Sequence, residues 1–259
     1  MLRGFLDAVY VMAYRQVKHF VRSPSRIIGS IVNPLIWIVF FGLGWAKAFN
    51  NPFMKVLLGG LDYLSFLVPG VIAMSVFTGS FLSGISVIFD KQFGFLKEIL
   101  VAPTPRSAAI LGRILGDSLT AMVQAALIAL VSIPFMEHIS VIGTLVALIY
   151  GYFVAIGFSA LGVAIASRMR SHEGFQLIMS FLILPLLFLS GAFYPVSLMP
   201  TWMKVLAYLD PLTYGVDAMR YWMTGVSWLS PITDLAALVL LDTALVGFAA
   251  MLFNKMTIE

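Results

Sequence analysis

The sequence predicts an all-α membrane protein with six transmembrane helices; two observations lead to that prediction, and a third excludes other classes. Of its 259 residues, 61% are hydrophobic and only 11% are charged, whereas a soluble domain is closer to half apolar and a quarter charged. Six stretches are long and apolar enough to cross a bilayer core, which needs about 20 mostly apolar residues. No cysteine is present, which excludes a disulfide framework and a thiolate nucleophile. The composition therefore excludes an ordinary soluble enzyme, a disordered chain and a disulfide-stapled secreted module.

Residues 1–25 are predicted to form an amphipathic helix that lies in the cytoplasmic membrane interface. Charged residues break up the continuous apolar core that a cleavable signal peptide needs; they are Arg3, Asp7, Arg15 and Lys18. At about 100° per residue, most apolar side chains fall on one side of a helix and most charged ones on the other, as in interfacial helices. Ser23 and Pro24 end this helix. It is either a simple anchor or a contact for a cytosolic partner.

Residues 26–259 are predicted to form one membrane domain. Its six spans are predicted at residues 27–46, 63–89, 118–136, 139–167, 174–203 and 233–254. The third span begins nearer Ser107 if Arg113 and Asp117 are tolerated at its cytoplasmic end, where their spacing predicts an intrahelical ion pair. Three prolines interrupt the fifth span, namely Pro185, Pro195 and Pro200.

The distribution of basic residues predicts that both termini are cytoplasmic. With the N-terminus inside, the cytoplasmic segments hold twelve of the sixteen Lys and Arg residues, and the outer segments hold Lys47, Lys55, Lys204 and Arg220. Positive charge is enriched in cytoplasmic loops of membrane proteins, and an even number of spans agrees with this orientation. The formal net charge of +4 is thus explained by topology and anionic lipid, and it indicates no nucleic acid partner.

The cytoplasmic loop after the second span, residues 90–106, is long for a connection between membrane helices. Residues 91–101 can form a short helix with exposed apolar side chains, and Pro103 and Pro105 end it because neither supplies a helical N–H. Such a helix fits docking into a groove on another protein. The alternative is that it lies against lipid headgroups.

The segment after the fifth span carries a second set of helix signals and is predicted to face outside. Three residues interrupt the helix at membrane depth: Ser190, Gly191 and Pro195. Pro200 can open one short helix, and Asp210 can cap a second one that has Pro211 at its first position. These signals predict an outer re-entrant hairpin over residues 198–224. Two residues on its second helix are spaced for an ion pair, Asp217 and Arg220.

Two patterns inside the spans indicate a buried polar group and close packing. Asp242 lies in the middle of the sixth span, where a charge costs roughly 2.5–3.5 kcal/mol on insertion scales, so it is expected to face protein or water. Its role is either structural or that of a proton or substrate contact. Small residues recur every four positions at Ala108, Gly112 and Gly116 and allow close helix approach, within one subunit or between two.

Two of these segments resemble the motifs of one transporter family. The residues Glu-Ile-Leu-Val-Ala-Pro-Thr-Pro-Arg at 98–106 resemble the cytoplasmic coupling segment of ABC-2 type transporter permeases. The residues from Leu189 to Arg220 resemble the C-terminal motif of that family, although Asp210 stands where many relatives have Asn. The size, the six spans, the interfacial helix and the outer hairpin extend this resemblance over nearly the whole chain.

The resemblance implies the membrane subunit of an exporter that moves a lipophilic drug or lipid-like substrate across the cell membrane. A polysaccharide or glycolipid exporter is the alternative within the family. Two permeases, identical or paralogous, would pair, and each would dock on a cytosolic ATPase subunit that binds ATP and Mg²⁺. This chain lacks a Gly-x-x-x-x-Gly-Lys-Ser/Thr phosphate loop, so it would bind no nucleotide in the usual way and would have no cofactor or catalytic site of its own.

The resemblance also assigns residues to two sites. Coupling to the ATPase is expected from Lys91, Phe95, Leu96, Lys97, Glu98, Leu100, Pro103 and Arg106. The outer hairpin motif comprises Ser190, Gly191, Tyr194, Pro195, Pro200, Asp210, Pro211, Tyr214, Asp217 and Arg220. The helix of residues 91–101 would transmit closure of the ATPase dimer to the membrane domain.

The residues also bear on other functional classes. A secondary transporter or channel normally carries several ionisable groups along its path or an internal repeat, and this sequence has one central aspartate and no clear repeat. An intramembrane enzyme needs a catalytic motif, but residues 157–161 depart from the Gly-x-Ser-x-Gly nucleophile turn at the last position. No metal site is expected, because the histidines are predicted in loops or at the interface: His19, His138 and His172.

Overall fold

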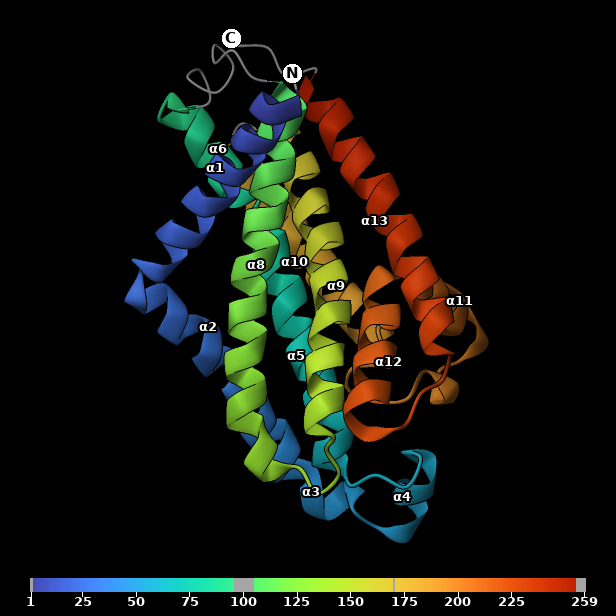
Figure 1. Ribbon diagram of the computed structural model, residues 1–259. Helices are drawn as coiled ribbons and strands as arrows, with labels where there is room; N and C mark the ends of the chain where they lie inside the picture. The colour runs from blue at the N-terminus through green and yellow to red at the C-terminus, as the bar shows by residue number, and fades with distance from the viewer. Residues whose placement is uncertain (1, 96–104, 170, 255–259) are drawn as a thin grey trace.

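The computed structural model describes residues 2–95, 105–169 and 171–254, and within these ranges the fold is all-helical (Figure 1). The first part comprises α1 (Leu2–Val21), α2 (Pro24–Trp37), the π-helical turn η1 (Ile38–Leu43), α3 (Gly44–Phe49), α4 (Pro52–Leu57), α5 (Tyr63–Leu82) and α6 (Ile85–Gln92). The middle part comprises α8 (Arg106–Ser132), the 3₁₀ turn η2 (Ile133–Phe135), α9 (Val141–Arg168) and α10 (His172–Leu189). The last part comprises the 3₁₀ turn η3 (Val196–Leu198), α11 (Thr201–Leu209), α12 (Pro211–Thr224) and α13 (Pro231–Asn254).

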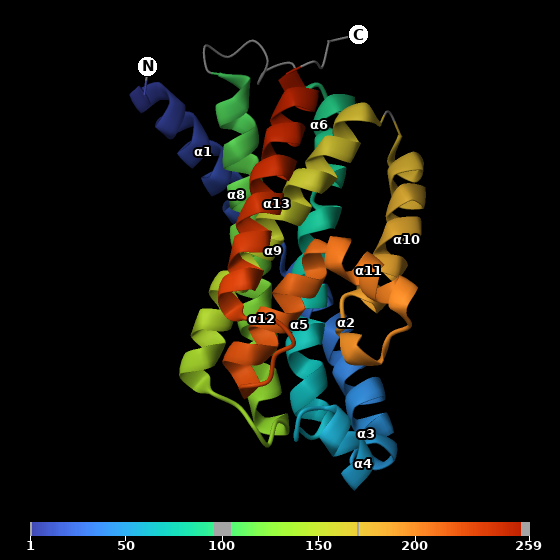
Figure 2. The same cartoon turned by 90° about the vertical axis from the view of Figure 1, so that its right-hand side faces the viewer.

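Six helical segments in the described part of the chain are long and apolar enough to cross a membrane, which confirms the predicted number of spans. They are Ile27–Phe49, Tyr63–Gln92, Arg106–Phe135, Val141–Arg168, His172–Leu189 and Pro231–Phe253. The start of α1 and the end of α13 lie at the same end of the bundle (Figures 1 and 2). The chain is therefore a multi-pass membrane protein with an even number of crossings.

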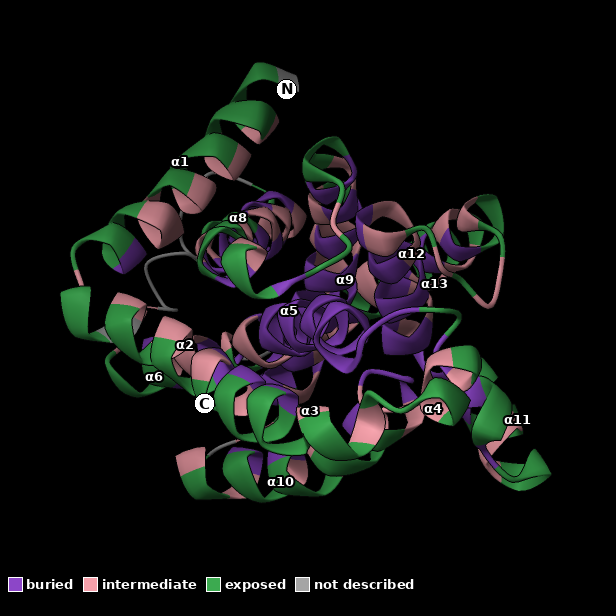
Figure 3. Cartoon of the chain, turned by 90° about the horizontal axis from the view of Figure 1, so that it is seen from below, coloured by how far each residue is buried: buried purple, intermediate pink, exposed green. Residues whose placement is uncertain are grey.

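The centre of the bundle is α5, which is apolar on every side. In the apolar part of its span 67% of the residues are buried, against 17% in the apolar parts of the first, fifth and sixth spans. Figure 3 shows the buried α5 enclosed by the other helices. A helix that is hydrophobic all round is stable only when other elements surround it. Aromatic packing joins α5 to α9, where the ring centroids of Phe77 and Phe158 are 4.4 Å apart.

The small-residue repeat on α8 packs against α1 of the same chain. A β-carbon at Gly112 would lie 2.8 Å from the Cβ of Met12 and 2.9 Å from the Cα of Val9. A β-carbon at Gly116 would lie 2.8 Å from the Cα of Ala13. Only a residue without a side chain permits this approach. The repeat therefore serves a contact within the subunit, and α1 is fastened to the bundle along one face.

The structure differs from the predicted boundaries at two places. The fifth span ends at Leu189 instead of continuing to residue 203, because Gly191 adopts a left-handed φ of 76° that turns the chain. Lys91 does not begin a new helix but lies in the last turn of α6, and Gly94 follows with a φ of 79°. The remainder of the predicted coupling helix, from residue 96 onward, lies outside the described residues.

Candidate functional site

The predicted coupling residues begin with Lys91, which is fixed to the bundle. Its Nζ donates hydrogen bonds of 3.0, 2.8 and 3.1 Å to the backbone carbonyls of Ala166, Ser167 and Met169. These carbonyls lie at the C-terminal end of α9, where a helix leaves acceptors without partners and its dipole favours a cation. Lys91 thus joins the start of the coupling segment to the end of α9. The predicted residues that lie outside the described part are Leu96, Lys97, Glu98, Leu100 and Pro103.

Asp90 joins three helices immediately before the coupling segment. Its Oδ2 accepts a 2.6 Å hydrogen bond from Nη1 of Arg113 on α8, and its Oδ1 accepts a 3.0 Å bond from Nη2 of Arg15 on α1. Arg113 also donates to Oγ of Ser86 at 2.6 Å. Both Asp90 and Arg113 are buried, at 8% and 3% exposure, so each charge needs the other as a close partner. We call Arg15, Ser86, Asp90 and Arg113 the Asp90 cluster.

The Asp90 cluster also corrects the partner predicted for Arg113. An intrahelical pair with Asp117 was expected from their spacing, but the guanidinium is directed at Asp90 and Ser86 of α6. An i,i+4 pair on a helix surface contributes only about 0.2–0.5 kcal/mol. Leaving a buried arginine without its carboxylate costs several kcal/mol. The long-range pair therefore takes precedence, and it links α8 to the coupling segment.

Arg15 connects α1 to the same segment by a second contact. Its guanidinium carbon lies 3.9 Å from the ring centroid of Phe95, a distance typical of a cation–π interaction. Arg15 therefore contacts both the carboxylate that precedes the coupling segment and an aromatic residue within it. These two contacts link this segment to α1.

The predicted outer hairpin contains two short helices, α11 and α12. Asp210 caps α12 by accepting a 2.9 Å hydrogen bond from the N–H of Leu212, and Pro211 occupies the first helical position, which confirms the predicted cap. Burial raises the pKa of the Asp210 carboxyl above its usual value. The hydroxyl of Tyr214 donates a 2.6 Å bond to the backbone carbonyl of Tyr208, so the two helices are also joined by a side chain.

Arg220 ties α12 to two other elements. Its Nη2 donates a 2.9 Å hydrogen bond to the carbonyl of Gly191, and its Nε donates a 3.2 Å bond to the carbonyl of Phe66 on α5. The guanidinium carbon lies 3.8 Å from the ring centroid of Phe66. Burial lowers the pKa of Arg220. One rigid planar group therefore donates to a carbonyl of a buried turn and to a carbonyl of α5.

Asp217 does not form the direct ion pair with Arg220 that its spacing predicted. Its oxygens instead accept hydrogen bonds of 2.8 Å from the N–H of Trp228 and 2.7 Å from the N–H of Leu229. Burial raises the pKa of the Asp217 carboxyl, and these two backbone hydrogen bonds oppose the shift. Because buried backbone groups need partners, both side chains are used to hold turns.

An apolar pocket of ≈ 260 Å³ lies between the first span and the segment that follows the fifth. Aromatic residues line it: Trp37, Phe41, Trp45, Phe49, Tyr63, Phe188, Phe193 and Tyr194. The first four recur every four positions along α2, η1 and α3, so their rings share one face. The ring centroid of Trp37 lies 4.9 Å from that of Phe41 and 5.3 Å from that of Phe193. π-helical turns such as η1 are frequent at functional sites, and Tyr194 brings the hairpin motif into the pocket.

Asp242 faces protein, as predicted for a carboxyl in the middle of a span. It is 7% exposed, and its Oδ1 lies against Gly157 of α9, where a β-carbon has no room. Among the described residues its Oδ2 has no hydrogen-bond partner. Asp234 on the same helix is fully buried, and neither of its oxygens has a partner within the same part of the chain. The sequence pattern alone gives no reason to single out Asp234.

The Asp90 cluster and the aromatic pocket were not predicted from the sequence either, although one feature of each is visible in the sequence. Asp90 lies at the end of an otherwise apolar stretch, a position where an ionisable residue commonly pairs with a neighbouring helix. The four-residue repeat of Trp37, Phe41, Trp45 and Phe49 indicates a single aromatic face. Neither signal by itself identifies the partner across the bundle.

Comparisons with known proteins bear on the class of this chain. Residues 7–224 match the family model described as ABC-2 type transporter. The chain is similar to the putative transport permease ycf38 of Cyanophora paradoxa, with 30% identity over 81% of this chain and 71% of that protein. It is similar to the inner membrane transport permease YadH of Escherichia coli K12, with 29% identity over 76% and 75%. It is also similar to the daunorubicin resistance ABC transporter permease protein DrrB1 of Streptomyces coeruleorubidus, with 27% identity over 80% and 72%.

Proposed function

Because this chain belongs to the ABC-2 type transporter family, we propose that it is the membrane permease of an exporter driven by a separate ATPase subunit. Permeases of this family are generally non-catalytic membrane components that work with an ABC ATPase. The family match over residues 7–224 carries the proposal. The sequence has no phosphate-binding loop, which supports the proposal that the partner subunit, and not this chain, binds ATP and Mg²⁺.

The Asp90 cluster is the proposed route from the ATPase into the membrane domain. Movement of the coupling segment would act on Asp90 at its start and on Phe95 within it. Arg15 contacts both residues, and Arg113 holds the second oxygen of Asp90. The segment is thereby connected to α1 and α8 by short charge-assisted hydrogen bonds. Because such bonds are short and strong, a displacement of the segment would move both helices.

The proposed cargo is lipophilic, a drug or a lipid-like molecule. Two observations support this class: the aromatic lining of the pocket between the first span and the hairpin motif, and the similarity to a permease named for daunorubicin resistance. The pocket volume of ≈ 260 Å³ is slightly below the roughly 300–1,000 Å³ of drug-sized sites, so it suits a ring system or one end of a larger molecule. Export of a polysaccharide or glycolipid is the competing outcome.

The proposed assembly contains two permeases and two ATPase subunits. The first, fifth and sixth spans contain few buried residues in the single chain, which leaves surface for lipid and for a second permease. Both termini are proposed to be cytoplasmic, with the hairpin of residues 198–224 in the outer leaflet. The absence of native cysteine permits a direct test: single cysteines at positions 3 and 257 should resist external labelling, and external labelling of either would contradict this orientation.

Association with the ATPase tests the coupling assignment. Glu98→Arg should weaken co-purification with the cognate ATPase and reduce export several-fold, because it reverses the charge of the coupling motif. Glu173→Arg, an exposed acidic residue at the start of α10, is the matched control and should retain both. Unchanged association and export in Glu98→Arg would contradict the assignment.

Transport in proteoliposomes tests the cargo class. Trp45→Ala removes a ring from the pocket, and it should lower export of a lipophilic aromatic dye several-fold. Trp202→Ala removes a 64% exposed ring that lies outside the pocket and should leave export near the wild-type rate. Equal rates in the two variants would exclude the pocket from the path of this cargo.

A further inference from the structure

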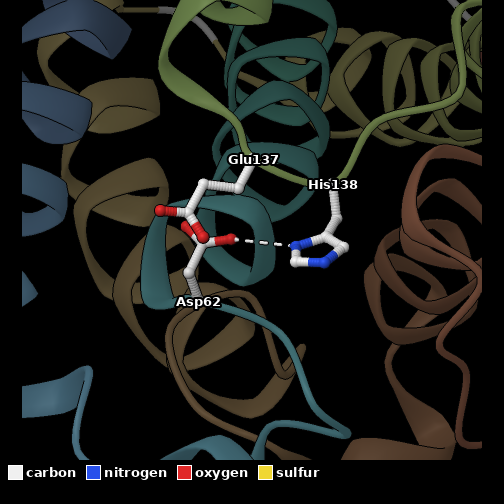
Figure 4. Close-up of side chains that lie close together, drawn as sticks. All are labelled: Asp62, Glu137 and His138. Atoms are coloured by element: carbon white, nitrogen blue, oxygen red, sulfur yellow. Dashed lines mark ion pairs between the residues drawn. The ribbon is translucent and has the colours of Figure 1, made fainter.

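Three side chains that could ligate a metal converge at the end of the bundle opposite to the start of α1. Asp62 directly precedes α5, and Glu137 and His138 lie in the segment that joins η2 to α9. One ligand atom from each residue lies within 4.8 Å of the other two. Figure 4 shows the two carboxylates and the imidazole directed toward one another from the two segments.

Ser65 on α5 positions two of the three residues. Its N–H donates a 3.0 Å hydrogen bond to Oδ2 of Asp62, which orients the carboxylate. Its Oγ accepts a 3.2 Å bond from the backbone N–H of His138, which holds the joining segment against the start of α5. Supporting hydrogen bonds of this kind fix the direction in which metal ligands point.

One oxygen of Asp62 is left without a hydrogen-bond partner. The side chain is 3% exposed, and Oδ1 makes no hydrogen bond among the described residues. Its charged neighbour is Nδ1 of the exposed His138 at 3.6 Å, and a buried carboxylate oxygen without a hydrogen bond is strongly disfavoured. The second carboxylate, Glu137, lies close by and makes the electrostatic potential at this point more negative, which favours a bound cation. The buried oxygen is aimed into the same space as the other two ligand atoms.

The distance between Asp62 and His138 fits a shared metal ion better than a hydrogen bond. Their Oδ1 and Nδ1 atoms are 3.6 Å apart, which is beyond the range of a hydrogen bond. Zinc binds imidazole nitrogen and carboxylate oxygen at about 2.0–2.2 Å in tetrahedral geometry, so neighbouring ligand atoms lie about 3.4 Å apart. Only small shifts of the exposed Glu137 and His138 side chains are needed to complete the coordination.

We propose that Asp62, Glu137 and His138 form a binding site for a divalent transition-metal ion of the Zn²⁺ class. One imidazole and two carboxylates suit Zn²⁺ and related ions, whereas Mg²⁺ prefers oxygen ligands in octahedral geometry. Three protein ligands leave the fourth tetrahedral position to water. The bound ion clamps the start of α5 to the connection between the third and fourth spans. The sequence by itself predicts no metal site at a histidine.

Titration calorimetry of the full chain in detergent with zinc sulfate tests the proposal. We expect saturable binding of one Zn²⁺ per chain, and at least tenfold weaker binding in Glu137→Gln and in His138→Gln. Both side chains are exposed, so these variants retain the fold. Magnesium chloride at the same concentration should not compete. Because the ATPase and the cargo are absent from this experiment, its outcome is independent of the proposed transport function.

Matched variants remove the same residue types elsewhere. His19→Gln and Glu173→Gln change an exposed histidine and an exposed glutamate outside the site, and both should bind Zn²⁺ as the wild type does. Asp62→Asn keeps an oxygen to cap Ser65 but removes the buried charge, and it should abolish binding. Absence of saturable binding in the wild type would overturn the proposal, as would equal affinity in the wild type and His138→Gln.

Discussion

Arg15 of α1 and Asp90 of α6 form a 3.0 Å ion pair although 75 residues separate them in the chain. The same carboxylate binds Arg113 of α8 at 2.6 Å. The two arginines differ in solvent access, because the side chain of Arg15 is 37% exposed and that of Arg113 is 4% exposed. One carboxylate therefore connects a partly exposed arginine to a buried one, and its two hydrogen bonds should contribute unequally to stability.

Substitution of Asp90 should destabilise the chain far more than substitution of Arg15. Asp90→Asn leaves Arg113 buried without a negative partner, which costs about 3–5 kcal/mol. Arg15→Gln removes a partly exposed pair, worth less than about 1 kcal/mol. Denaturant-induced unfolding of the two purified variants measures both losses. Equal losses would show that Arg113 is satisfied without Asp90.

Addition of a single methyl group to α8 should separate α1 from the bundle. Gly112→Ala places a β-carbon within 3 Å of Val9 and Met12, and such overpacking costs about 1–3 kcal/mol. We expect faster proteolysis between α1 and α2 and a lower melting temperature. Gly29→Ala is the control, since no atom lies within 4 Å of its added β-carbon, and it should be neutral or slightly stabilising. Equal melting temperatures in the two variants would contradict the prediction.

Substitution of Arg220 by lysine should destabilise the protein. Arg220 donates from Nε and Nη2 to carbonyls of two elements, and a single ammonium cannot reproduce that planar geometry. Arg220→Lys should lose about 1–3 kcal/mol, because at least one buried carbonyl is left without a donor. Lys204→Met on α11 removes a cation that forms no ion pair within the described residues and should change the melting temperature little. A wild-type melting temperature in Arg220→Lys would refute this role.

The stability of the outer hairpin should decrease as pH rises. Burial raises the folded-state pKa of Asp210, so the folded chain holds this proton more tightly than the unfolded chain, whose pKa is about 3.9. The resulting stabilisation is complete below the unfolded pKa and is lost as pH rises through the folded pKa. Asp210→Asn keeps the cap on Leu212 and removes the titration. Melting temperatures across this pH range should fall in the wild type and less steeply in the variant; parallel profiles would contradict the assignment.

Local signals in the sequence predicted local structure correctly. The number of spans followed from apolar length, because the hydrocarbon core sets how many residues a helix needs. The cap formed by Asp210 and Pro211 was also predicted, since it depends on residues within a single turn. The partners of Arg113 and Arg220 were predicted wrongly from spacings of four and three residues. In both cases the observed acceptors lie on other segments of the chain, namely α6 for Arg113, and α5 and the turn at Gly191 for Arg220, where no spacing rule applies.

The sequence by itself determined that this protein resides in a lipid bilayer, how many spans it has and which family its two motifs resemble. The tertiary structure alone decided which polar groups meet. Asp90 pairs with arginines of α1 and α8, and Asp62 comes close to His138, across distances in the chain that no periodicity predicts. The physical reason is that hydrophobicity acts on each segment separately, whereas a buried charge is stable only beside a specific partner that packing brings to it.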